Sequence, residues 1–277
     1  MTPQRMSETG LLDWINGDVD HANLQVTAQR HDALQTIFHL AGGSHVGRSF
    51  QNPAEDFQRT VVAASQLFEW ARQNSPQTPI VVVSSAAVYG AGHEGQIGED
   101  SVLNPFSPYG ANKAILESLA RSYCNNFGLK IAICRLFSVY GEGLEKQLIF
   151  DLCRKCSQAE GSIQLGGTGN ELRDWIHVSD VARLLWMLPD QCTPDCFTVN
   201  GASGQATTVR QVAEHVVKAW DLTLPIEFSG QSRPGDPVSL VAEVSRAKSL
   251  GFQPEIDMPA GFQRVADWFR SNQNQQG

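Results

Sequence analysis

The chain has 277 residues, enough for one large domain or for a domain with a smaller companion. Its 21 basic and 29 acidic residues argue against a nucleic-acid-binding surface. No apolar run approaches the ~18 residues that a membrane span requires, and the polar start MTPQRMSETG does not resemble a signal peptide. We therefore expect a soluble cytoplasmic protein without nucleic-acid or membrane partners.

Apolar runs alternate with amphipathic segments through the first half of the chain, which favours a parallel sheet covered by helices on both faces. Strands are predicted at 36–42, 79–85 and 129–137. Helices are predicted at 54–73 and 107–127. Ser107 and Pro108 suit the first turn of the second helix, and Gly128 suits its end.

After residue 140 the pattern changes. The predicted elements are a helix near 145–158, a short strand in SIQLGG, the segment RDWIHVSDVARLLWML, a helix in TTVRQVAEHVVKAW and a final helix near 258–270. Ser179 and either Thr207 or Thr208 are the expected N-caps. These segments predict a smaller second unit beside the sheet domain.

Six cysteines stand at positions 124, 134, 153, 156, 192 and 196. Disulfides are uncommon in a cytosolic chain of this size. The pairs Cys153/Cys156 and Cys192/Cys196 can be posed as four zinc ligands. However, LIFDLCRKCSQ is typical of a helix and no tight turn frames either pair, so we expect buried thiols and no metal.

Tyr109 and Lys113 are four residues apart at the start of a predicted helix and so share a face. A lysine ammonium lowers the pKa of a nearby phenol by favouring its anion. Such a tyrosine can take a proton from a sugar or alcohol hydroxyl while hydride leaves the carbon. Ser85 ends a buried strand, where a parallel sheet places its reactive edge. The spacing alone is frequent by chance, so its context decides.

That context is a series of seven segments: GDV (17–19), FHLAGGSHVGRSFQNP (38–53), VVVSSAAVYG (81–90), SPYGANK (107–113), RLFSVYG (135–141), LRDWIHVSDVA (172–182) and RPGD (233–236). They resemble the extended short-chain dehydrogenase/reductase family, in its nucleotide-sugar epimerase/dehydratase branch and closest to UDP-glucose and UDP-galactose 4-epimerases. The resemblance implies an α/β, Rossmann-like fold with a smaller C-terminal substrate subdomain. An NAD-binding domain is implied in 1–140 with about 173–200, and a nucleotide-sugar-binding subdomain in 141–172 and 201–277.

The resemblance also implies a role for each matching residue. The implied catalytic residues are Ser85, Tyr109 and Lys113. The implied cofactor contacts are Asp18, Val19, Leu40, Ala41, Gly42, Gly43, Thr60, Tyr109, Lys113 and Phe137. The implied substrate contacts are Ser85, Ser138, Arg173, Arg233 and Asp236, with the two arginines on the diphosphate. NAD is the implied cofactor, with NADP as an alternative, and a nucleotide-diphosphate sugar is the implied substrate.

Plainer interpretations stand beside some of these roles. Asp18 is also a plausible turn residue, and Arg173 a plausible surface ion-pair partner. His39 and His177 lie in strand-like apolar settings, where packing is a better expectation than catalysis.

The residues after Ser85 bear on the reaction. Sugar 4,6-dehydratases of this family carry Asp-Glu there, whereas this chain has Ala86 and Ala87, which cannot move protons. Epimerisation at C4 through a 4-keto intermediate is the leading expectation. An NADPH-dependent 4-ketosugar reductase remains open, because it uses the same three residues once. Thr60 and Ser138 depart from the asparagines that many relatives have.

Family members open with a strand, a GxxGxxG turn and a helix that hold the cofactor pyrophosphate, and nothing in this sequence matches them. About 40 residues of the usual plan are absent, including the first strand, its helix and the second strand. A shortened gene model or a piece of a longer enzyme, a non-catalytic sugar-nucleotide-binding homologue, and a strand rebuilt from another segment are the three explanations.

The resemblance implies a homodimer, because helices near 54–72 and 107–127 form the dimer contact in the family. Trp70, Leu116, Leu119 and Tyr123 are the side chains expected to supply apolar contact area. The alternative is that these side chains merely cover the sheet.

Overall fold

A sheet of four parallel strands forms the first half of the computed structural model, which describes residues 10–30, 34–158, 161–231 and 237–273. Its strand order is β1 (Ile37–His39), β2 (Ile80–Ser85), β3 (Ile131–Leu136) and β7 (Phe197–Gly201). β2 and β3 pair from Ile80 opposite Ile131 to Ser85 opposite Leu136. Among the described residues β1 pairs only with β2 and is therefore an edge strand.

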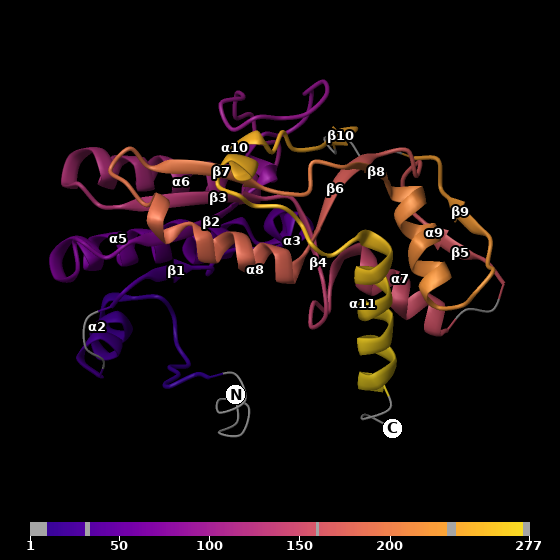
Figure 1. The fold of residues 1–277 in the computed structure, drawn as a ribbon, viewed down its shortest axis with the longest axis horizontal. Coiled ribbons are helices and arrows are strands. Elements are labelled where there is room, and N and C mark those ends of the chain that lie inside the picture. The colour runs from indigo at the N-terminus through magenta and orange to yellow at the C-terminus, as the bar shows by residue number, and fades with distance from the viewer. Residues whose placement is uncertain (1–9, 31–33, 159–160, 232–236, 274–277) are drawn as a thin grey trace.

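Helices cover both faces of this sheet, as predicted (Figure 1). One face is packed by α2 (His21–Arg30), α5 (Ala63–Asn74) and α6 (Pro108–Phe127). The other face is packed by α8 (Val178–Met187) and α10 (Ser245–Ser249). Because apolar side chains meet both faces, the strands are continuous apolar runs.

The helix predicted at 54–73 is confirmed but is not uniform. It consists of α4 (Pro53–Phe57), a π-helical turn at Gln58–Val62 and α5. Trp70 of α5 and Leu116 of α6 are almost fully buried in the cluster between these helices and the sheet. Their expected place in a dimer contact is therefore wrong, since both side chains cover the sheet inside their own chain.

The start of α6 follows the sequence expectation. The Ser107 hydroxyl accepts a hydrogen bond from the Gly110 amide at 3.1 Å, and Pro108 occupies the first turn. The helix ends at Gly128, whose φ of 71° lies in the left-handed region that glycine tolerates. These two ends fix the direction in which Tyr109 and Lys113 project.

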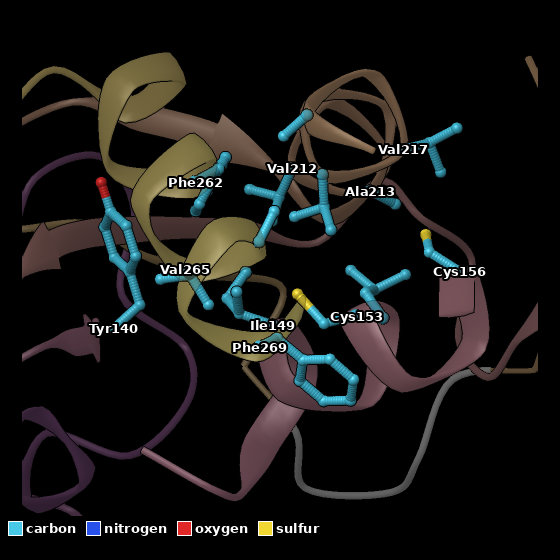
Figure 2. Packing of buried hydrophobic residues seen from close by; sticks show 14 of the residues in the cluster. Tyr140, Ile149, Cys153, Cys156, Val212, Ala213, Val217, Phe262, Val265 and Phe269 are labelled. Atoms are coloured by element: carbon cyan, nitrogen blue, oxygen red, sulfur yellow. The ribbon is translucent and has the colours of Figure 1, made fainter. Parts of the chain in front are cut away.

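A second group of helices packs around its own apolar cluster (Figure 2). These helices are α7 (Gln147–Ser157), α9 (Val209–Ala219) and α11 (Met258–Gln273). β5 (Ile163–Leu165) and β9 (Ile226–Phe228) pair beside them. Thr208 is the N-cap of α9, and its side chain and that of Gln211 exchange capping hydrogen bonds, which confirms one of the two predicted caps.

A small sheet lies between the two helix groups (Figure 1). Its strands are β4 (Ser138–Tyr140), β6 (Leu172–His177), β8 (Ala206–Thr208) and β10 (Ser239–Leu240). Helix α3 (Val46–Gln51) follows β1. Because β4 follows β3 almost at once and α8 follows β6, the chain passes directly between the two halves at this sheet.

The predicted cap Ser179 is wrong by two residues. His177 is the N-cap of α8, and its ring Nδ1 accepts a hydrogen bond from the Ser179 amide at 3.2 Å. The same ring is buried, with Nε2 at 3.0 Å from a Glu142 carboxylate oxygen. His177 is therefore packed, as the sequence predicts, and in addition it caps α8, which the sequence did not predict.

All six cysteines are buried free thiols. Cys153 and Cys156 lie in the cluster of the second helix group, whereas Cys192 and Cys196 lie on opposite faces of the main sheet. In the described part of the chain, no cluster of three or more His, Cys, Asp or Glu side chains is placed to hold a metal ion. Within the same residues, no helix is both long and apolar enough to cross a membrane.

Candidate active site

A cleft of about 650 Å³ opens at the carboxyl ends of the parallel strands. The last residues of β2 and β3, Ser85 and Leu136, form its floor together with the loop that follows β1. Walls from α6, β4, β6 and the segment before α7 surround it. This is where an open parallel sheet places a ligand.

Ser85, Tyr109 and Lys113 all line this cleft. Ser85 ends β2, and its hydroxyl also accepts a hydrogen bond from the Ala87 amide at 3.2 Å. The Tyr109 phenol interacts with the Ser85 hydroxyl. Lys113 lies one turn further along α6 and donates to the Val83 carbonyl oxygen at 2.9 Å. The three residues that the sequence predicts to act together therefore lie in the same cleft.

The pKa of Tyr109 differs from the sequence expectation. Burial raises the pKa of this phenol, the interaction with Ser85 lowers it, and the charge of Asp56 raises it. The net direction is upward, so the predicted lowering by Lys113 is wrong for this structure. The physical reason is that the ammonium is directed to the Val83 carbonyl, while loss of water contact penalises the phenolate.

Burial also changes the pKa of Lys113, a residue that is only 3% exposed. Loss of water lowers the pKa of this amine to about 8, against the opposing charges of Asp56 and Glu117. The group therefore changes charge within the range in which many enzymes work.

The cleft is cationic although the whole chain has a formal charge of −8. Lys113, Lys146 and Arg173 line it, and no aspartate or glutamate occurs among the described lining residues. The Lys146 ammonium reaches the Ser44 hydroxyl at 2.6 Å, which connects the segment before α7 with the loop after β1. Such a lining suits an anionic ligand, because fixed cations replace its lost hydration.

The predicted cofactor residues after β1 fall into two groups. Leu40, Gly42 and Gly43 line the cleft, as does Phe137 beyond β3. Gly42 has a φ of 139°, and a Cβ there would stand 3.2 Å from the Lys113 ammonium nitrogen. Ala41 is half-buried between its neighbours. The loop can therefore approach a ligand with its backbone only because it carries no side chain at Gly42.

Three other predicted cofactor residues do not line the cleft. Thr60 is fully buried and its hydroxyl accepts a hydrogen bond from the Gly43 amide at 2.9 Å, so it supports the loop from behind. Asp18 is exposed, and its carbonyl oxygen accepts from Asn23 at 2.9 Å, in keeping with a turn residue. Val19 packs against the apolar cluster between the main sheet and the helices α2, α5 and α6. Cofactor contacts of these residues stay predictions.

The predicted substrate residues are partly described. Ser138 and Arg173 line the cleft beside Ser85, and Arg173 also donates to the carbonyl oxygen of Leu172 at 2.8 Å. Arg233 and Asp236 lie outside the described residues. His39, expected to be a packed residue, is buried, and burial together with Lys113 lowers its pKa to about 4.

Sequence reasoning missed several polar residues behind the cleft. The Asp56 carboxylate accepts a hydrogen bond of 2.7 Å from the side chain of Asn112, the residue that precedes Lys113 in the chain. Glu117 accepts from the Ser84 hydroxyl at 2.6 Å and forms an ion pair with Arg135. A carboxylate inside an otherwise apolar helix face is the one sequence signal that points to such positions.

Comparison with known proteins gives the following similarities. The sequence matches the NAD dependent epimerase/dehydratase family over residues 2–199. A UDP-glucose 4-epimerase of Azospirillum brasilense is 30% identical over 277 residues, covering 93% of this chain and 79% of the relative. A dTDP-glucose 4,6-dehydratase of Streptomyces antibioticus is 30% identical over 265 residues, covering 94% and 76%. The structure of MoeE5 in complex with UDP-glucuronic acid and NAD matches with a TM-score of 0.84 and 31% identity, covering 93% and 85%.

Proposed function

Because the chain belongs to the NAD-dependent epimerase/dehydratase family, we propose that it epimerises a nucleotide-diphosphate sugar at C4 through a 4-keto intermediate, with NAD as its cofactor. The observation that carries this proposal is the convergence of Ser85, Tyr109 and Lys113 on one cationic cleft at the sheet edge. The similarity to a UDP-glucose 4-epimerase and to MoeE5 with its NAD and UDP-sugar complexes supports it.

The residues present fit a dinucleotide. Leu40, Gly42, Gly43 and Phe137 offer a loop and an aromatic wall, and Lys113 stands beside the glycines. These residues, with Ala41 between them, are the ones we propose to hold the cofactor. When bound, NAD supplies a site that accepts hydride from the sugar carbon and returns it.

The chain's own residues manage the proton. Tyr109 is protonated in this structure, because burial raises its pKa. In our proposal the positive charge that NAD would bring favours the phenolate, which takes the proton of the C4 hydroxyl during oxidation and gives it back after the sugar has turned. Ser85 interacts with the same phenol and orients the reacting oxygen. Lys113 provides a positive charge one helical turn away, and Arg173 and Lys146 offer cations to the diphosphate.

Dehydration is not favoured at this site. Ala86 and Ala87 line the cleft directly after Ser85, so neither position offers a carboxylate that could remove water from the sugar. A 4-ketosugar reductase remains the second candidate, because the same three residues complete one hydride step. The two differ in stoichiometry, since epimerisation is redox-neutral and reduction consumes one NADPH per turnover.

The test is conversion of UDP-glucose, UDP-glucuronic acid, UDP-N-acetylglucosamine and TDP-glucose by the purified chain with NAD and without reductant. We expect one of these sugars to reach an equilibrium mixture with its C4 epimer, detected by proton NMR, with no net change in absorbance at 340 nm. Conversion of a 4-keto sugar nucleotide with stoichiometric loss of NADPH, and no epimer, would instead support the reductase. Binding of UDP by calorimetry without binding of NAD or NADP would support a non-catalytic sugar-nucleotide protein.

We also propose a homodimer formed through the outer face of α6. Leu119 and Tyr123 are half-buried there, and Ile115 and Phe127 are 44% and 52% exposed. Their spacing of four residues aligns the four side chains along one face of the helix. This apolar stripe supports the contact, in place of the buried Trp70 and Leu116.

A further inference from the structure

Asp56 is a buried carboxylate immediately behind the catalytic cleft. It lies in α4 and is 7% exposed. One carboxylate oxygen accepts a hydrogen bond from the Asn112 side chain at 2.7 Å. Among the described residues no lysine or arginine forms an ion pair with it. Asp56 is therefore a charge taken out of water with an amide as its partner, an arrangement that proteins rarely keep without a reason.

The surroundings of Asp56 are parts of the catalytic site. Its other carboxylate oxygen lies against Gly43, where an added Cβ would stand only 1.8 Å away. Asn112 directly precedes Lys113 on α6. The carboxylate is thus held between the loop after β1 and the helix turn that carries the catalytic lysine. An alanine at Gly43 has no room unless this carboxylate moves.

We propose that Asp56 is a positioning residue of the catalytic site, whose buried negative charge keeps Lys113 in its ammonium form. This role goes beyond the three residues at the centre of the proposed function, and it rests on that function only for its effect on turnover. The effect on the charge of Lys113 is a property of the protein itself.

Of the described titratable groups around Lys113, Asp56 is the one that can supply an uncompensated negative charge. His39 from β1 is neutral at pH 7, because its pKa is about 4. Tyr109 from the same helix has a raised pKa and is neutral as well. Glu117, one turn further along α6, is already paired with the buried Arg135. Asp56 is the carboxylate near Lys113 that has no cation of its own.

The opposing effects on the pKa of Lys113 agree with a role for Asp56. Burial lowers the pKa of the amine to about 8, and Asp56 is the larger of the two charges that oppose this lowering, ahead of Glu117. If the Asp56 charge is removed, burial is opposed only by Glu117 and the pKa of Lys113 falls further. A neutral Lys113 at pH 7 to 8 would no longer support a negative charge on the substrate oxygen or on Tyr109.

The test is the titration of Lys113 in Asp56→Asn, which keeps the shape and removes the charge. The chain has six lysines, so ¹³C-lysine labelling gives few signals, and a Lys113→Met spectrum identifies the one of interest. We expect the NMR midpoint of Lys113 to fall by about one pH unit or more from its wild-type value near 8. The alkaline limb of the turnover profile should fall with it.

Glu55→Gln is the matched control, because Glu55 is the neighbouring carboxylate but is only half-buried and is paired with the exposed Arg48 and Arg59. Its Lys113 midpoint should stay at the wild-type value. An unchanged midpoint in Asp56→Asn, or an equal shift in Glu55→Gln, would overturn the proposal.

Asn112→Ala provides an independent variant if Asp56→Asn does not fold. It removes the hydrogen bond to Asp56 and keeps the charge. We expect its Lys113 midpoint to remain at or above the wild-type value, even if turnover falls. A downward shift of about one unit would mean that the packing, and not the charge, sets the state of the lysine, which would contradict the proposal. Because the midpoint is measured without substrate, loss of the proposed activity leaves this result interpretable.

Discussion

Tyr109 and Lys113 both depart from the pKa values of exposed side chains, and in opposite directions. The pKa of the phenol is raised by burial, while the pKa of the amine is lowered by burial to about 8. At pH 7 the tyrosine is therefore protonated and the lysine mostly charged. In this state the Tyr109 hydroxyl can donate a hydrogen bond to an acceptor oxygen in the cleft.

That Ser85, Tyr109 and Lys113 meet at one cleft could be predicted from the sequence, because each has a local signal. Ser85 follows a continuous apolar strand, and Tyr109 and Lys113 have the i,i+4 spacing behind a recognisable helix start. Asp56 has no such signal, since its partner Asn112 is 56 positions away. The contact between Lys146 and Ser44 spans 102 positions and is equally invisible to local patterns.

At the scale of elements, a buried ion pair fixes α6 to the sheet. Arg135 of β3 and Glu117 of α6 are joined by two hydrogen bonds, at 2.9 and 2.7 Å, and both side chains are 2% exposed. Glu117 also accepts from Ser84 of β2, while Arg135 donates to Tyr89. The network therefore sets the position of the helix that carries Tyr109 and Lys113 relative to Ser85.

Glu117→Gln tests this connection. The variant leaves the Arg135 charge buried with a weaker partner, so we expect a loss of roughly 3 to 5 kcal/mol in the free energy of unfolding. Urea unfolding followed by circular dichroism measures it. Asp151→Asn is the control, because it pairs with the exposed Arg154 and the half-buried Lys155 near the surface, and the expected loss is below about 1 kcal/mol. Equal losses in the two variants would show that the buried pair does not fix the helix.

The predicted helix boundaries are correct where a glycine or threonine marks the end or start of a helix, and wrong where a second side chain nearby can also form the cap. Gly128 ends α6 and Thr208 caps α9, as expected from the conformations these residues favour. Ser179 is the cap that the sequence predicts, because hydroxyls are common caps, yet the imidazole nitrogen of His177 accepts the capping bond. The π-helical turn at 58–62 leaves the apolar stripe intact and so gave no signal in the pattern.

At the scale of the whole molecule, the alternation of strands and helices was enough to predict the parallel sheet and its two covered faces. The small sheet of β4, β6, β8 and β10 was not predicted, because its strands are short and pair across long stretches of chain. This sheet matters for function, since Ser138 and Arg173 reach the cleft from it.

The proposed dimer is tested by sedimentation velocity at micromolar concentration. We expect the wild-type chain to sediment as a dimer and Ile115→Glu as a monomer, because a charge would be buried in the middle of the α6 stripe. Val102→Glu is the control, since Val102 is 77% exposed and is not part of that helix. A wild-type chain that stays monomeric, or a dimer that survives Ile115→Glu, would contradict this contact.

The most direct test of the central claim is the turnover of Tyr109→Phe on whichever sugar nucleotide the wild-type chain epimerises, measured beside Tyr123→Phe. Both changes remove one phenol oxygen from α6, but only Tyr109 lines the cleft. We expect Tyr109→Phe to bind the sugar nucleotide as the wild type does and to lose at least about a hundredfold in turnover, while Tyr123→Phe keeps it. Turnover of Tyr109→Phe at the wild-type rate would contradict the account.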